Sequence, residues 1–280
     1  MGSELPDHGL EEEAEWREAE EGLSRGNDLI SELPDDIISS IVSYLTLRDA
    51  VKTSLVEQIE LSAMNLLRFE YSSRFRVKNS FLGVPKLEEA YFTVECRGEV
   101  HEQIFHQLAK QDLPKLRILY VLAYGHWARI PKMIGIFSKV ETLELCFIRK
   151  MDFDALKMIA ILRAFPLLRK FSLAMRCAIC FEQEGLLETN ELVHEYLEEV
   201  HLHGFYATSN QIKFAIYLLK HALALKLLVI DPKVKFRISS HPSWMSGEEF
   251  TDRQSWFKGE REEIYEKLQE FSKDDVLIIK

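Results

Sequence analysis

Residues 116–121 read LRILYV, with apolar residues at the first, fourth and sixth positions. The same spacing recurs at six other places: LLRFEY from Leu66, LEEAYF from Leu87, VETLEL from Val140, LRKFSL from Leu168, LEEVHL from Leu197 and LKLLVI from Leu225. Successive starts lie 21, 29, 24, 28, 29 and 28 residues apart. Such near-regular recurrence favours a repeat architecture over an ordinary α/β domain with chance leucines.

Each copy of the pattern predicts a short strand, because alternate residues of a strand face the same side. Two of the intervening stretches predict helices. Residues 153–165 read FDALKMIAILRAF, have apolar residues at helical spacing and end before Pro166. In TSNQIKFAIYLLKHAL, Thr208 and Gln211 are spaced as a capping box, and one apolar face follows, formed by Ile212, Ala215, Ile216 and Leu219.

Leucine-rich repeats contain one strand and one covering segment in every 20–29 residues or so. We therefore predict the α/β class: a leucine-rich-repeat solenoid with parallel strands side by side and helices on the outside. The asparagine or cysteine of a strict leucine-rich consensus is mostly missing from the patterns. The solenoid is therefore expected to be irregular.

Charge is distributed unevenly along the 280 residues, which carry a formal net charge of −10. Between Met1 and Asp28 there are ten acidic and two basic residues, or −8, which leaves −2 for the rest. Residues 1–27 are thus predicted to be an acidic disordered tail. A basic footprint for nucleic acid is absent. No apolar run approaches the about 18 residues that span a bilayer, so no membrane partner and a cytoplasmic and/or nuclear location are expected.

Before the repeats lies an amphipathic opening, LPDDIISSIVSYL, residues 33–45. Pro34 suits the first turn of a helix, where its missing N–H has no intrahelical partner to lose. Ile37, Ile41 and Leu45 contribute to an apolar stripe along this helix. Thr46 and Asp49 are spaced to open a second short helix. Two short helices cannot bury both apolar faces alone, so some of these residues need another surface.

Residues 29–56, LISELPDDIISSIVSYLTLRDAVKTSLV, resemble an F-box. Two later stretches resemble the FBD domain: YLEEVHLHGFYATSNQIKFAIYLLKHALALKLLVIDP at 196–232, and the closing-helix sequence GEREEIYEKLQEF at 259–271. Together with the repeats, they make the chain similar to the plant family that combines an F-box, leucine-rich repeats and an FBD domain. The expected domains are residues 28–60 (F-box-like), 61–190 (repeats) and 191–280 (FBD-like, continuing the repeats).

The resemblance implies a substrate-recognition subunit of an SCF-type ubiquitin ligase. Such a receptor binds a Skp adaptor, and through it a cullin scaffold, and holds an unidentified target protein. The implied adaptor-binding residues are Leu33, Pro34, Ile37, Ile41, Leu45, Ala50 and Val51. The concave strand face of the repeats would hold the target. The receptor needs no catalytic residue and no cofactor, because other subunits carry the chemistry and the receptor supplies proximity.

One segment departs from the family pattern. F-boxes usually continue with a basic and aromatic third helix, whereas residues 57–67 read EQIELSAMNLL. Ile59, Leu61 and Met64 are candidates for a substitute apolar helix face. If they do not substitute, the alternative function is a repeat-based binding protein with a defective F-box that joins no ligase.

Three other features leave alternatives open. Cys177 and Cys180 form a C-x-x-C pair that would suit half a zinc site or a redox pair, although no second pair completes it. Residues 203–206, HGFY, suit either a partner-binding loop or a tight turn whose aromatic residues pack beneath the next helix. Trp244 and Trp256 lie in a polar stretch and could anchor it or bind a partner.

Overall fold

The computed structural model describes residues 58–73, 78–81, 83–96, 105, 108–109, 113–125, 135–147, 155–175, 193–237, 244–246, 255–273 and 275–280. They belong to the larger of two compact units, residues 51–280. The acidic tail and residues 28–56 of the F-box-like module lie outside the described residues.

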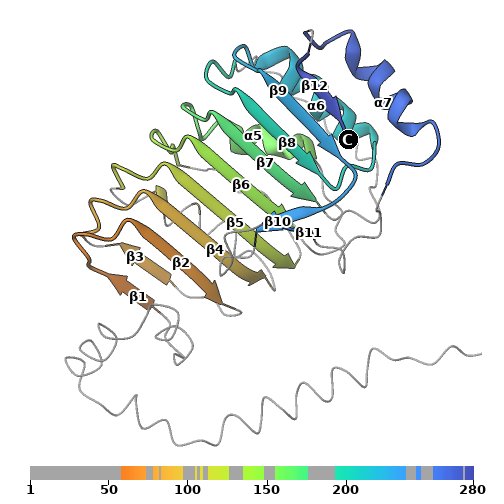
Figure 1. Cartoon of the computed structure of the whole chain (residues 1–280). Coiled ribbons are helices and arrows are strands. Elements are labelled where there is room, and N and C mark those ends of the chain that lie inside the picture. Colours follow the sequence, from red (N-terminus) through yellow and green to blue (C-terminus); the bar gives the residue numbers. More distant parts are fainter. Residues whose placement is uncertain are drawn as a thin grey trace, which may run out of the picture. The chain divides into compact units, whose positions relative to one another are not determined.

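Eight parallel strands form one sheet, in the order β12-β9-β8-β7-β6-β5-β4-β2 (Figure 1). Their bounds are β2 (Arg68–Ser73), β4 (Glu89–Cys96), β5 (Ile118–Gly125), β6 (Thr142–Phe147), β7 (Lys170–Met175), β8 (Glu199–His203), β9 (Leu227–Asp231) and β12 (Leu277–Ile279). Strand order in this sheet follows chain order. That arrangement is typical of a solenoid, where each repeat pairs with its sequence neighbours.

All seven copies of the apolar pattern form strands of this sheet, and each strand starts at the third residue of its pattern. In most repeats a turn closes just before the strand. The N–H of Leu116, for example, donates to the carbonyl of Leu113 at 3.2 Å, and the N–H of Leu168 donates to that of Phe165 at 3.2 Å. Proline is favoured at the second position of such turns, which is where Pro85, Pro114 and Pro166 lie. The predicted solenoid of parallel strands is confirmed.

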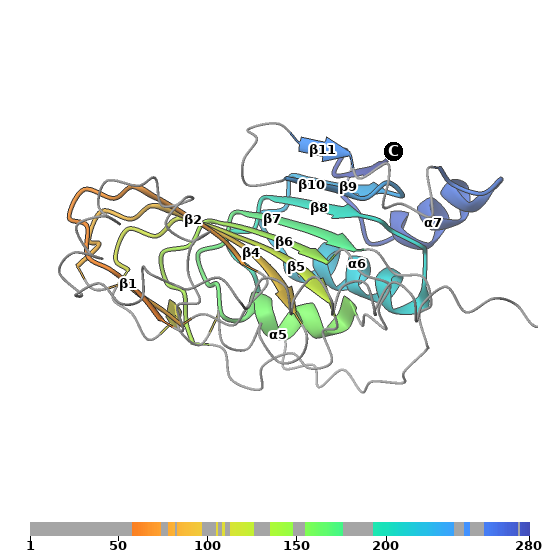
Figure 2. The ribbon, with the colours of Figure 1, turned by 90° about the horizontal axis from the view of Figure 1, so that it is seen from below.

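The described helices are the short 3-10 helix η1 (Ala155–Lys157), α5 (Met158–Leu162), α6 (Ser209–His221) and α7 (Glu260–Gln269). Figure 2 shows α5 and α6 on one face of the sheet. Phe171 of β7 meets Phe214 of α6 edge to face, with ring centroids 6.5 Å apart. Strand residues that face the helices are almost fully buried: Phe69, Ala90, Leu119, Leu143, Phe171, Val200 and Leu228 are all 0% exposed. This layer is the main core, and its burial supplies much of the stabilisation.

Helix α6 begins with the predicted capping box. The Thr208 hydroxyl accepts a hydrogen bond from the Gln211 N–H at 3.3 Å, and the Gln211 side chain accepts one from the Thr208 N–H at 3.4 Å. Its buried face is rotated from the predicted one. Phe214 and Leu218 are 0% exposed, whereas the predicted Ile216 and Leu219 are only half-buried. The large ring of Phe214 decides which side of the helix faces the sheet.

Residues 58–67 do not form a helix. Strand β1 (Gln58–Leu61) pairs in parallel with β3 (Lys78–Phe81), and a turn from Ala63 to Leu66 then leads into β2. Leu61 is 9% exposed and Met64 is 65% exposed. The interpretation of Ile59, Leu61 and Met64 as one substitute helix face is therefore wrong. Ile59 and Leu61 are two residues apart, which also fits the period of a strand.

A tight turn follows β8, with Gly204 at φ +66°. Phe205 is fully buried there, and the Trp256 ring meets it edge to face at 6.5 Å. The Trp256 indole N–H also donates to the backbone carbonyl of Lys280. The HGFY turn is thus a structural element, and Trp256 is one of its anchors.

The chain turns back after β9 into a small antiparallel pair, β10 (Lys235–Arg237) and β11 (Trp244–Ser246). Figures 1 and 2 place this pair on the sheet face opposite α5 and α6. Among the residues that the structure describes, no helix is long and apolar enough to cross a membrane.

Candidate protein-binding surface

The sheet face opposite the helices is organised in three rows that run across the strands. The first row lies nearest the strand starts. The register of the strands aligns in it Arg68, Glu89, Ile118, Thr142, Lys170, Glu199 and Leu227. The second row is Glu70, Tyr91, Tyr120, Glu144, Ser172, His201 and Val229, and the third row contains Thr93, Leu122, Cys146, Ala174, His203 and Asp231. The rows differ sharply in their exposure to solvent.

The third row from Leu122 to Asp231 and the second row from Tyr91 to Ser172 are closed to solvent. Tyr91, Tyr120, Leu122, Cys146 and Ala174 form an apolar cluster with Val234, and each is at most 3% exposed. Val234 directly precedes β10, so the returning chain packs on this half of the face. The concave face expected to hold a target is therefore not open along its full width.

Asp231 fixes the turn that leads into β10. Its side chain accepts hydrogen bonds from the Lys233 N–H at 2.9 Å and from the Lys235 ammonium at 2.6 Å. Burial alone would raise the pKa of Asp231, but these hydrogen bonds hold it below its ordinary value. The Nδ1 atom of His203 lies 4.0 Å from the Asp231 carboxylate. Burial lowers the pKa of His203 to about 4 despite that carboxylate, so the imidazole is neutral near pH 7.

The first row is open, and all seven of its residues are exposed or half-buried. Arg68 lies 3.8 Å from Glu89 and stacks over the Tyr91 ring at 4.3 Å, while Lys170 bonds Glu199 at 2.9 Å. Burial alone would raise the pKa of Glu199, but hydrogen bonds from Lys170 and from His201 bring it below its ordinary value. The first row therefore presents charged side chains of both signs, interspersed with Ile118, Thr142 and Leu227.

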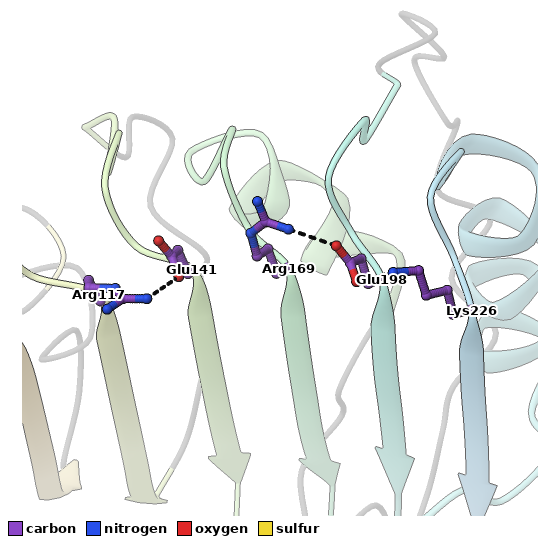
Figure 3. A network of polar contacts seen from close by, with 5 residues as sticks. All are labelled: Arg117, Glu141, Arg169, Glu198 and Lys226. Carbon is purple, nitrogen blue, oxygen red and sulfur yellow. Dashed lines mark hydrogen bonds and ion pairs between the residues drawn. The ribbon is translucent and has the colours of Figure 1, made fainter.

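A further row lies one residue before strands β4 to β9. It consists of Glu88, Arg117, Glu141, Arg169, Glu198 and Lys226, and we call these six residues the amino edge. Arg117 bonds Glu141 at 2.8 Å and Arg169 bonds Glu198 at 2.7 Å (Figure 3). Lys226 bonds the other carboxylate oxygen of Glu198 at 2.5 Å. The Arg117 hydrogen bond lowers the pKa of Glu141, and that of Lys226 lowers the pKa of Glu198.

The amino edge was not recognised from the sequence, although its signal is present there. Its residues occupy the second position of six of the repeated patterns, the position after the first leucine or valine, and their charges alternate from one repeat to the next. A search for apolar residues alone passes over this position. Charges that change sign between repeats become visible only when the patterns are aligned on each other.

The predicted adaptor-binding residues Leu33, Pro34, Ile37, Ile41, Leu45, Ala50 and Val51 lie outside the described residues, and so do Cys177 and Cys180. Within the described ranges, no group of three or more histidine, cysteine or acidic residues is placed to hold a metal ion. Cys146 is 2% exposed, and burial raises the pKa of its thiol well above the ordinary value. This thiol is poorly suited to nucleophilic chemistry.

Eight parallel strands in chain order, with repeated turns and an open polar row, define a leucine-rich-repeat protein of the protein-binding type. The leucine-rich-repeat domain model of the At1g61320/AtMIF1 type matches residues 37–253, more than half of the chain. The chain belongs to that family.

The chain is also 30% identical over 116 residues to the F-box/FBD/LRR-repeat protein At5g44980 of Arabidopsis thaliana. This match covers 39% of the chain and 22% of the relative's length. The resemblance to plant F-box and leucine-rich-repeat proteins is confirmed. No solved structure matches.

Proposed function

We propose that this chain is the substrate-recognition subunit of an SCF-type ubiquitin ligase. Its F-box-like helices would bind a Skp adaptor, and thereby a cullin, while its repeats hold a target protein. The observation that carries the proposal is an array of parallel strands with an open polar first row, placed after an F-box-like sequence. The chain supplies proximity between target and ligase and performs no catalysis.

Target binding is assigned to the first row, because the third row is closed by the chain itself. A photo-crosslinking residue at Thr142, near the centre of the first row, is expected to label bound target. The matched control is the same residue at Lys213, which is exposed on helix α6 on the opposite side. Equal labelling from both positions would exclude the first row as the binding surface.

Adaptor binding is tested by a pull-down of the intact chain with a plant Skp adaptor. Ile37→Asp with Leu45→Asp is expected to abolish capture, because it places two carboxylates in the apolar stripe. Ser40→Asp with Ser43→Asp adds the same charge between the apolar positions of that helix and is expected to retain capture. Failure of the unmodified chain to bind would contradict the ligase function and favour the alternative, a binding protein with a defective F-box.

The two functions also differ in the response to a restored third helix. A family-like third helix should be inserted between Val56 and Glu57, not exchanged for EQIELSAMNLL. Exchange would remove β1 and the turn at residues 63–66, which belong to the repeats. A large gain in adaptor affinity on insertion supports the defective F-box. Unchanged affinity supports an F-box that is already sufficient.

A further inference from the structure

The amino edge holds its six side chains in one row on a repeated backbone frame. The backbone carbonyl of each amino-edge residue except Lys226 accepts hydrogen bonds from two N–H groups of the next repeat. Thus the N–H groups of Glu141 and Thr142 donate to the Arg117 carbonyl at 2.8 and 3.0 Å. Adjacent strands lie about 4.8 Å apart, so the row presents one charged side chain at each such step.

Charges along this row alternate without interruption: Glu88, Arg117, Glu141, Arg169, Glu198, Lys226. Every neighbouring pair interacts. Three pairs are ion pairs of 2.5–2.8 Å, and the charges of Glu88 and Arg117 and of Glu141 and Arg169 also act on each other. The row has no net charge. It therefore offers no field that would select a nucleic acid or a partner of one sign.

An alternating row with an even number of members is complementary to itself when it is reversed. A two-fold axis between β6 and β7 would place Glu141 opposite Arg169 of a second copy. The same axis pairs Arg117 with Glu198 of that copy, and Glu88 with its Lys226. All six positions then face the opposite charge, as a surface shared by two identical subunits requires.

Exposed apolar side chains lie in the segments that precede four of these strands. Ile136, in the segment before β6, is 72% exposed, and Leu167, in the turn before β7, is 37% exposed. Tyr196 and Leu223, in the turns before β8 and β9, are 42% and 59% exposed and extend the apolar surface. Apolar side chains beside charged ones are usual in a protein interface.

We propose that the amino edge is the contact surface of a homodimer whose two-fold axis lies between β6 and β7. The expected observation is a reversible dimer of the full chain in light scattering or sedimentation, weakened by salt because its charges are near solvent. A chain that remains monomeric at all concentrations and at low salt overturns the proposal.

Charge reversal tests the geometry. Glu141→Arg places arginines opposite each other at both symmetric contacts and should weaken dimerisation roughly tenfold or more. Arg169→Glu does the same with carboxylates. Mixed together, the two variants should dimerise with each other, because every facing pair is again opposite in charge. No mixed dimer, or undiminished dimers of the separate variants, overturns the assigned axis.

Combining both substitutions in one chain separates the dimer from the internal ion pairs. Glu141→Arg with Arg169→Glu leaves like charges next to each other within the chain, yet all facing pairs across the two-fold axis stay opposite. Dimerisation should return, whereas a purely internal role predicts further loss. Glu263→Arg, which breaks the exposed 2.6 Å pair with Lys267 on α7, is the matched control and should leave dimerisation unchanged.

Discussion

The α-carbon of Gly204 lies so close to Met175 that an added Cβ atom would be 1.8 Å from the Met175 carbonyl oxygen. The same atom would lie 2.7 Å from a Val234 methyl, and Gly204 has φ +66°. The turn after β8 thus brings the end of β7 and the start of the β10 segment into contact with one glycine. This contact allows the returning chain to close the third row.

Gly204→Ala should lower the free energy of unfolding by about 3–5 kcal/mol, since left-handed backbone strain and backbone overlap both contribute. Gly259→Ala is the matched control. Gly259 has φ +83° but no atom within 4 Å of an added Cβ, so strain alone should cost about 1–2 kcal/mol. Urea unfolding measures both variants, and equal losses would contradict the role of the Met175 contact.

The capping box of α6 gives a second prediction. Thr208→Ala removes the acceptor of the Gln211 N–H and should cost about 1 kcal/mol of stability. Thr208→Ser keeps a hydroxyl at the same place and should cost less than half as much. Thermal or urea unfolding distinguishes the two. Equal destabilisation would mean that the Thr208 methyl matters more than its hydroxyl.

His203 gives a prediction for pH. Burial lowers its pKa in the folded chain to about 4 from the ordinary 6.5. Between these values the unfolded chain binds the extra proton, so stability falls as the pH falls, by up to about 3 kcal/mol at this site. His203→Gln should reduce the slope of the curve of unfolding free energy against pH from about 6.5 to 4. A curve parallel to that of the unmodified chain would contradict the burial of a neutral His203.

Cys146 should resist alkylation in the folded chain, because its thiol is buried and its pKa is raised. Iodoacetamide at pH 8, followed by peptide mass spectrometry, should show Cys146 unmodified without urea and fully modified with it. Rapid modification of Cys146 in the native chain would mean that the third row is open to solvent.

Sequence patterns predicted the strands well, because the buried face of each strand places apolar residues at every second position. LRILYV and LEEVHL mark β5 and β8 directly, whereas the helix predicted to run to residue 165 ends at Leu162 and Pro166 lies in the turn before β7. The prediction failed where the two periods overlap: the spacing of Ile59 and Leu61 suits a strand, and the spacing of Leu61 and Met64 suits a helix turn.

The candidate surface was less predictable. Closure of the third row depends on the packing of Val234 against residues of earlier strands, such as Tyr120 and Leu122. No local pattern encodes a contact between segments that far apart. Alternation along the amino edge was readable in principle, but it links residues 24–29 positions apart, so it appears only when the repeats are aligned.

Closure of the third row also limits which residues of the sheet face can determine the choice of binding partner. The amino edge and the first row both combine solvent access with a fixed place in every repeat from β4 to β9, which amounts to two neighbouring residues per strand. Except at Ile118, which packs against the apolar cluster, changes there leave that cluster untouched. Specificity should thus be transferable as dipeptides, such as Glu141–Thr142 or Arg169–Lys170, grafted between relatives without redesign of the fold.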